Sequence, residues 1–197
     1  LLNPIFLNKS REQENELKGD AVYKLSSKSE LNFGAGLKLI KFNADIKLPS
    51  FVTTFGDTLS LTSLSTQKNF RKFNLYAQYS DVILDRLHYN FGLRSDYFSG
   101  INEKFYLSPR FSALYMLNDV SNKNLAAGIY YQSPSYIWLA AYNSNKNLSA
   151  VKVFQYVLGY ERRLRGDLRV KVEAFYKDYK DYPASLLRPY LVLANTG

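Results

Sequence analysis

The 197-residue chain contains no cysteine and only one histidine, His88. The absence of cysteine excludes disulfide bridges, thiol catalysis and thiolate metal sites, and it removes any redox clue to the compartment. A single histidine is a weak basis for a hydrolase triad, and the sequence has no H-x-x-x-H, EF-hand or P-loop motif. A hydrogen-bonded structural role explains His88 better. We therefore expect no enzymatic activity, no metal site and no cofactor.

Long hydrophobic runs are absent as well. With glycine counted as apolar, the longest runs are LAAGIYY at 125–131 and YIWLAAY at 136–142. A helix needs about 20 apolar residues to span a bilayer, so transmembrane helices are excluded. The mean hydropathy of −0.28 does not exclude a transmembrane β-barrel, because alternating strands average to a mildly polar value.

Residues 1–20 lack the pattern of a secretory signal peptide. Their apolar start is short, Pro4 interrupts it, and acidic residues follow in place of a small-residue cleavage site. We interpret the chain as either a cytoplasmic protein or a mature or truncated piece of a longer one.

Basic residues exceed acidic ones, 26 to 17, which gives a formal net charge of +9. Such an excess raises the possibility of nucleic-acid binding. The lysines and arginines are spread along the whole chain, however, and no block of five, zinc-ligand spacing or RNP-like string occurs. We expect no nucleic-acid partner and interpret these charges as solvated faces.

The chain is rich in aromatic residues, with 17 Tyr, 13 Phe and one Trp, and its clearest pattern has a period of two. In KFNLYAQYS, residues 72–80, the odd positions are apolar and the even positions are mostly polar. Residues 87–97, 105–117 and 168–177 alternate in the same way. Each segment therefore predicts a β-strand with one apolar and one polar face.

Alternating segments and turn signals together predict about eight strands in meander order. No run of 12 or more residues shows the 3.6-residue period of a helix. The strands are expected near 15–25, 30–47, 69–81, 87–98, 105–117, 123–132, 151–164 and 168–180.

Short and long connections alternate between these strands. Short turns are expected near 26–29, 82–86, 118–122 and 165–167, and the other connections near 48–69, 99–104, 133–150 and 181–197 are mostly long. Barrels of the outer membrane have short periplasmic turns and long extracellular loops. Strands of 10–13 residues also match the roughly 9–11 residues of a tilted transmembrane strand.

Many aromatic residues fall at strand ends, where membrane barrels carry interfacial girdles. They are Tyr79, Tyr97, Phe98, Phe105, Tyr106, Tyr130, Tyr131, Tyr160, Tyr176 and Tyr179. The predicted fold class is therefore all-β, an antiparallel up-and-down transmembrane β-barrel. The alternative is a soluble β-protein whose tyrosines cap a core.

Three segments resemble the barrel domain of TonB-dependent outer-membrane receptors. The first is FGLRSDYF at 91–98, which leads into YLSPRFSALY at 106–115. The second is GIYYQSP at 128–134, and the third is YVLGYERRLRGDLRVKVEAFYKDYKDY at 156–182. The motifs are weak singly but specific in this order, and the resemblance covers roughly residues 70–182.

The sequence also departs from that family. The family commonly has an N-P-x-L-K-P-E-like string where this chain has NKNLSAVK at 145–152, and YLVLANTG at 190–197 does not resemble a closing strand. No plug domain and no TonB box are recognisable. Since large receptors of this type use 22 strands around a plugged lumen, eight strands correspond to about a third of a barrel. We therefore expect a fragment, residues 1–197 being a partial barrel domain.

The resemblance implies a receptor of the bacterial outer membrane that binds and imports a scarce nutrient with energy from TonB. The nutrient would be a siderophore, cobalamin, an oligosaccharide or a peptide. The implied partners are the lipid bilayer, the plug and remaining strands of the same receptor, the TonB system acting through the plug, and a small nutrient ligand.

Five residues are candidates for ligand binding. Tyr136, Trp138 and Tyr142 lie in the expected external loop 133–150, where aromatic rings can stack on a sugar, a siderophore or a peptide side chain. The alternative is that YIWLAAY is an apolar loop that packs on its neighbours or on the membrane rim. Arg94 and Arg110 are candidates for contact with an anionic ligand or the plug. The alternative for them is pairing with acidic lumen residues, Asp96 and Glu161.

Two other functions stay open at this point. Eight strands can close as a small barrel with a structural or adhesive role. Against this, seven inward charges would crowd a narrow lumen: Arg94, Asp96, Arg110, Glu161, Arg163, Lys171 and Glu173. The third hypothesis is a soluble β-sheet protein.

Overall fold

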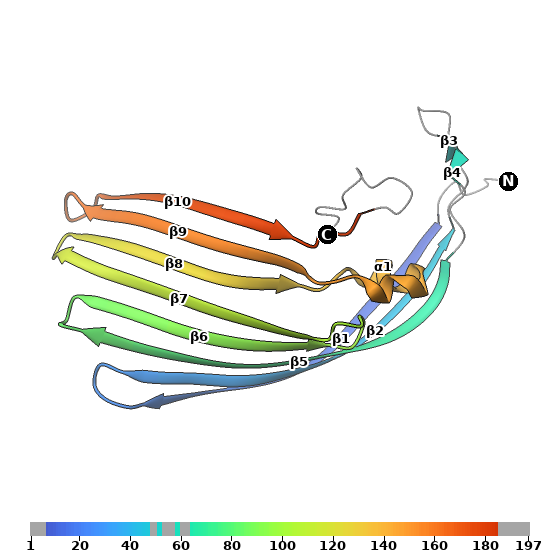
Figure 1. Cartoon of the computed structure of the whole chain (residues 1–197), viewed down its shortest axis with the longest axis horizontal. Helices are drawn as coiled ribbons and strands as arrows, with labels where there is room; N and C mark the ends of the chain where they lie inside the picture. Colours follow the sequence, from blue (N-terminus) through green and yellow to red (C-terminus); the bar gives the residue numbers. More distant parts are fainter. Residues whose placement is uncertain (1–6, 48–50, 53–57, 60–63, 185–197) are drawn as a thin grey trace.

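The computed structural model describes residues 7–47, 51–52, 58–59 and 64–184. Within these ranges eight long strands form one sheet, in which each strand is antiparallel to the next along the chain (Figure 1). In sheet order they are β1 (Leu7–Lys24), β2 (Glu30–Lys47), β5 (Leu64–Ile83), β6 (Leu87–Phe98), β7 (Phe105–Asn118), β8 (Ser121–Gln132), β9 (Val151–Arg163) and β10 (Arg169–Lys180). The predicted all-β, up-and-down class is confirmed.

Smaller elements lie in two of the connections. The strands β3 (Phe51–Val52) and β4 (Thr58–Leu59) lie in the connection from β2 to β5 and pair with each other as a separate small sheet. The helix α1 (Tyr136–Ala141) and a 3-10 turn at Asn143–Asn147 lie between β8 and β9. In the part of the chain that the structure describes, no helix is long and apolar enough to cross a membrane.

Some strand boundaries differ from those expected. β1 begins at Leu7 and not near residue 15, because the backbone of this segment pairs with β2. The sequence did not indicate a strand here, since residues 8–16 are polar on both faces and show no alternation. β5 begins at Leu64 and so includes the end of the connection expected at 48–69. The segment 133–150, expected as a loop, contains α1. Most of the connection expected at 181–197 lies outside the described residues.

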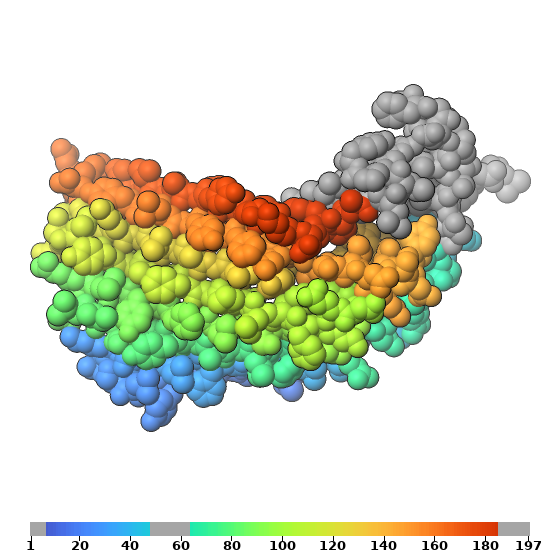
Figure 2. Space-filling model, viewed as in Figure 1, coloured from blue at the N-terminus to red at the C-terminus, as the bar shows by residue number. Residues whose placement is uncertain are grey.

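The sheet has two free edges. Among the described residues, β1 pairs only with β2 and β10 only with β9, so the sheet is an open, curved wall (Figure 1). The space-filling view shows the strands following one another in chain order across this face (Figure 2). The hypothesis of a self-contained eight-stranded barrel is therefore wrong for the arrangement described.

Short turns gather at one end of the sheet, which we call the turn end, and the longer connections lie at the other, the loop end. At the turn end Leu84 and Asp85 adopt the left-handed conformation of a tight hairpin, with φ of 50° and 53°. Lys28 in the neighbouring turn forms an ion pair with Asp85. The hydrogen bond and positive charge of Lys28 lower the pKa of that carboxyl.

One face of the sheet, the apolar face, exposes large hydrophobic side chains from every strand. Leu75, Leu158 and Val172 are 49 %, 59 % and 65 % exposed, although each lies in the interior of a strand. A soluble monomer rarely exposes so extensive an apolar surface. A lipid-facing band does expose one, so this surface argues against the soluble β-protein hypothesis.

The opposite face, the polar face, carries Asn74, Arg94, Asp96, Arg110 and Glu173. Their face follows from the register, in which Asn74 pairs with Asp96 and Arg94 with Ser108. A cavity bordered by residues of β2, β5, β6, β7 and β8 lies on this side.

At the loop end the two faces exchange character. On β2 the apolar residues are odd-numbered up to Leu39 and even-numbered from Ile40 to Ile46. On β5 the same change separates Phe73, which is exposed, from Phe70, which is buried. The helix α1 packs on β5, so apolar side chains are covered on the polar side here. The resulting loop-end core consists of Ile40, Phe42, Ala44, Ile46, Phe70, Phe98, Ile101, Tyr106, Tyr136, Leu139, Ala140 and Ala150.

Candidate functional site: a cationic cavity at the loop end

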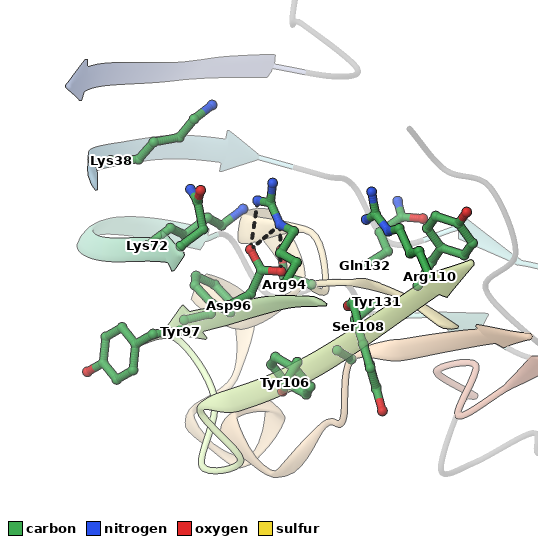
Figure 3. A pocket seen from close by; sticks show the side chains of 15 residues that line it. Lys38, Lys72, Arg94, Asp96, Tyr97, Tyr106, Ser108, Arg110, Tyr131 and Gln132 are labelled. Atoms are coloured by element: carbon green, nitrogen blue, oxygen red, sulfur yellow. Dashed lines mark hydrogen bonds and ion pairs between the residues drawn. The ribbon is translucent and has the colours of Figure 1, made fainter. Parts of the chain in front are cut away.

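A cavity of about 430 Å³ opens on the polar face beside the loop-end core. Five neighbouring strands supply its walls, and Ala150, just before β9, closes one side. The cavity is lined by Lys38, Lys72, Asn74, Arg94, Asp96, Tyr97, Phe98, Tyr106, Ser108, Arg110, Tyr130, Tyr131, Gln132, Ser133 and Ala150. Figure 3 shows these side chains.

Strand separation makes room for this cavity. The pairing of β7 with β8 ends at Arg110 and Gly128, although both strands continue toward the loop end. Tyr130 and Tyr131 lie on the part of β8 that no longer pairs with β7 but still pairs with β9. The two strands thus diverge as they approach the loop end (Figure 1), and the aromatic and polar side chains of both border the space between them.

Positive charge dominates the lining. Four cationic side chains, Lys38, Lys72, Arg94 and Arg110, border the cavity, against one carboxylate, Asp96. Lys38 is already engaged, because its Nζ lies 3.1 Å from Glu14 and 3.5 Å from Glu16 on β1. The cavity therefore keeps a net positive charge.

Arg94 and Asp96 form the tightest ion pair of the site. They are two residues apart on β6 and so share its polar face. Arg94 Nε donates to Asp96 Oδ1 and Oδ2 at 3.0 and 2.8 Å, and Arg94 Nη2 donates to Oδ1 at 2.8 Å (Figure 3). Of the pairings considered from the sequence, the structure contains this one, whereas Glu161 contacts Arg169 at 3.6 Å.

The other two cations are held by aromatic rings. The guanidinium carbon of Arg110 lies 4.6 Å from the Tyr130 ring centroid. Lys72 Nζ lies 5.0 Å from the Phe98 centroid and 4.8 Å from that of Tyr136. Among the described residues neither cation forms an ion pair with a carboxylate. Ring faces attract a cation without neutralising it, so both charges remain available to an anion.

Tyr136 joins α1 to the wall. Its ring stacks on Phe70 with centroids 5.1 Å apart, and it also contacts the tilted rings of Phe42 and Phe98. Its hydroxyl donates a hydrogen bond to Glu14 Oε1 at 3.2 Å. Burial, and then the charge of Glu14, raise the pKa of the Tyr136 phenol, so the group is protonated and able to donate. Tyr136 is therefore buried and does not line the cavity itself, but its ring contacts Lys72, which does.

The two remaining candidates, Trp138 and Tyr142, also lie outside the cavity lining. Trp138 is half-buried, and its carbonyl accepts a hydrogen bond from Asn145 Nδ2 at 2.8 Å. Tyr142 is 60 % exposed. Neither residue lines the cavity, whereas Arg94 and Arg110 do. Whether any of the five candidates contacts a ligand stays a prediction.

Sequence reasoning did not single out Lys38 and Lys72. They are register partners on the polar face of β2 and β5, and the alternation in 72–80 already placed Lys72 on that face. A count of the cations on the polar faces of the predicted strands would have identified Lys72. In the described part of the chain, no group of three or more His, Asp or Glu side chains is arranged to hold a metal ion.

Comparison with known proteins agrees with this architecture. The family model described as TonB dependent receptor-like, beta-barrel, matches residues 5–196. The chain therefore belongs to this family, whose members are β-barrel proteins of the bacterial outer membrane and act as receptors. The resemblance found in the sequence is confirmed. No significant match to a curated protein was found.

Solved structures support the fold. A ferric enterobactin receptor, PfeA, of Pseudomonas aeruginosa superposes with a TM-score of 0.70 at 17 % identity, over 87 % of this chain and 27 % of that one. The siderophore receptor PirA of Acinetobacter baumannii gives 0.67 at 18 % identity, over 87 % and 27 %. PirA of Pseudomonas aeruginosa gives 0.66 at 19 %, over 95 % and 35 %. The chain thus spans about a quarter to a third of these receptors.

Proposed function

We propose that this chain is part of the wall of an outer-membrane receptor that binds a scarce nutrient and imports it with energy from TonB. The observation that carries the proposal is the cationic cavity at the loop end, bordered by Lys72 and Arg110. Each of these cations faces the cavity without a carboxylate partner among the described residues. A ligand with several negatively charged oxygens would supply what both lack.

The chemistry of the cavity favours an anionic ligand. Hydrogen bonds between a cation and an anionic oxygen are roughly twice as strong as neutral ones. The aromatic residues Tyr106, Tyr130 and Tyr131 add flat surfaces beside the cations. The matched structures include receptors for ferric enterobactin and other siderophores, which supports a ferric siderophore over cobalamin, an oligosaccharide or a peptide.

Membrane placement supports the same function. The apolar face would contact lipid, the turn end would face the periplasm and the loop end the outside, as in other outer-membrane barrels. The polar face would then meet the plug below the cavity, where a smaller cavity of about 210 Å³ is bordered by Arg94, Arg110 and Gly92. The plug and the remaining strands would come from the rest of the receptor, and TonB would act through the plug.

The function is tested by uptake of radiolabelled ferric siderophores into cells that carry the receptor containing this chain. We expect uptake of an anionic ferric siderophore, its loss when the receptor gene is deleted, and its loss when TonB is inactivated. Neutral ferric complexes of similar size serve as the control. Uptake that survives loss of TonB, or that prefers the neutral complexes, would contradict the proposal.

A further inference from the structure

The exchange of polarity between the two faces marks a level on the wall. On the apolar face, the last fully apolar row of neighbouring residues runs through Leu17, Leu37, Phe73, Tyr97 and Phe105. The next row toward the loop end contains Asn15, Leu39 and Arg71. Beyond that row the outward side chains of β1, β2 and β5 are polar as far as Lys9, Lys47 and Ser65, so the apolar belt ends here.

Charge is segregated across β1 at the same end. Glu12, Glu14 and Glu16 occupy even positions and point to the polar face, whereas Lys9 and Arg11 occupy odd positions and point outward with the belt. Lys41 and Arg71 also point outward, from β2 and β5. The outward surface beyond the belt is therefore basic, although β1 as a whole is rich in acidic residues, because those residues point to the opposite face.

Three of these cations form a continuous diagonal. Leu39 pairs with Arg71 while Lys41 pairs with Asn69, so Arg71 and Lys41 are diagonal neighbours on adjacent strands. Gln13 pairs with Lys41 while Arg11 pairs with Asn43, so Lys41 and Arg11 are diagonal neighbours as well. Such neighbours are about 7–8 Å apart. Long side chains at that spacing can reach the same group.

The side chains of Arg11, Lys41 and Arg71 are exposed. None of them forms an ion pair with any residue that the structure describes. Asp45, a carboxylate on the outward surface, lies beyond Lys41 toward the loop end and pairs in register with Lys9. The backbone of Arg71 is fixed to the turn after β6, because its N–H donates to Ser99 Oγ at 2.8 Å.

We propose that Arg11, Lys41 and Arg71 form a binding surface for the phosphate groups of membrane lipid headgroups. The inference rests on the membrane placement proposed above. With the apolar belt in the hydrocarbon, the cations lie at the depth of the adjoining headgroups. The amide side chains between them, Gln13, Asn43, Gln67 and Asn69, can donate hydrogen bonds to the remaining oxygens of the same headgroups.

Position and charge together select a lipid as the occupant. A basic cluster next to an apolar membrane surface attracts anionic headgroups, at about 1 kcal/mol for each Lys or Arg. A soluble acidic partner would have no reason to bind at the edge of the belt. The oxygens of one phosphate group can accept hydrogen bonds from two diagonal cations at once.

The surface is tested on the complete receptor in detergent, titrated with phosphatidylglycerol or phosphatidylcholine and analysed by native mass spectrometry. We expect phosphatidylglycerol to bind in preference to phosphatidylcholine. The triple variant R11Q/K41Q/R71Q should bind phosphatidylglycerol more weakly, by about fivefold for each cation removed. The control K24Q/R163Q/K177Q makes the same charge change on the polar face and should bind as the unmodified receptor does.

Equal weakening in both triple variants, no weakening in either, or no preference between the two lipids would overturn the proposal. Siderophore binding by the same samples separates this result from the proposed function. R11Q/K41Q/R71Q leaves the cationic cavity intact, so it should bind an anionic ferric siderophore normally. If the unmodified receptor shows no preference for an anionic over a neutral ferric siderophore, the proposed function is contradicted. The lipid result would still stand.

Discussion

The variant K72Q/R110Q of the receptor containing this chain binds an anionic ferric siderophore much more weakly than the unmodified receptor. Each substitution removes a cation that borders the cavity and has no carboxylate partner among the described residues. A hydrogen bond to a charged group contributes about 1.5–3 kcal/mol, so we expect a loss of about tenfold to a hundredfold for each cation. Equilibrium titration of the purified receptor, followed by ligand absorbance or calorimetry, measures this loss.

The control for this variant is Arg163→Gln. Arg163 also lies on the polar face, at the turn-end limit of β9, and it is exposed and does not line the cavity. Its substitution should change the affinity by less than about twofold, as expected for a distant, screened charge. If R163Q weakens binding as much as K72Q/R110Q does, the cationic cavity is not the binding site.

The second large effect concerns the apolar face. Leu93→Arg places a charge in the interior of β6, on a side chain that is 41 % exposed beside Ala77 and Pro109. An arginine at the bilayer midplane costs a membrane barrel about 2–4 kcal/mol. We expect L93R to reduce the folded fraction of the receptor in lipid vesicles, measured by heat-modifiable electrophoretic migration over a urea series.

A matched change on the opposite face separates membrane exposure from general damage. Gln78→Arg introduces the same side chain on β5, where Gln78 points to the polar face opposite Gly92. A Cβ on Gly92 would meet its nearest neighbours only at 3.8 Å, so space exists on that side for a longer residue. Q78R should fold nearly as well as the unmodified receptor. Equal destabilisation by the two arginines would show that the apolar face does not meet lipid.

The alternation of 72–80 and 87–97 was enough to predict both faces of the middle strands. In these segments each side chain lies on either the apolar or the polar face of the sheet, so hydropathy reports orientation directly. The ion pair of Arg94 with Asp96 follows from the same rule, since residues two apart on a strand share a face. These features depend on local sequence alone.

Other features depend on contacts between distant segments. The first half of β1 has no apolar alternation and is a strand because β2 offers its backbone edge, with pairs that extend to Leu7 and Lys47. The helix α1 has only six residues, too few for a helical period to be recognised. Its place over Phe70, and with it the contact of Tyr136 with Lys72, depends on packing between segments more than 60 positions apart.

The exchange of faces on β2 is visible in the sequence itself. Ile40, Phe42, Ala44 and Ile46 continue the alternation of the preceding residues with the opposite parity. Such a shift inside one strand indicates that the environment of its two faces has changed. It places the end of the apolar belt, and therefore the three outward cations, without reference to the structure.

Site-directed spin labelling along residues 67–79 tests the central claim most directly. Because this chain contains no cysteine, each label can be introduced singly within it, and its accessibility to oxygen and to a water-soluble nickel complex can be measured with the receptor in lipid vesicles. We predict oxygen accessibility at Phe73, Leu75 and Ala77, aqueous accessibility at Asn74 and Tyr76, and aqueous accessibility of the outward positions Gln67 and Asn69. Labels at adjacent positions that show the same environment throughout, or lipid exposure of Asn74 and Tyr76, would contradict the account.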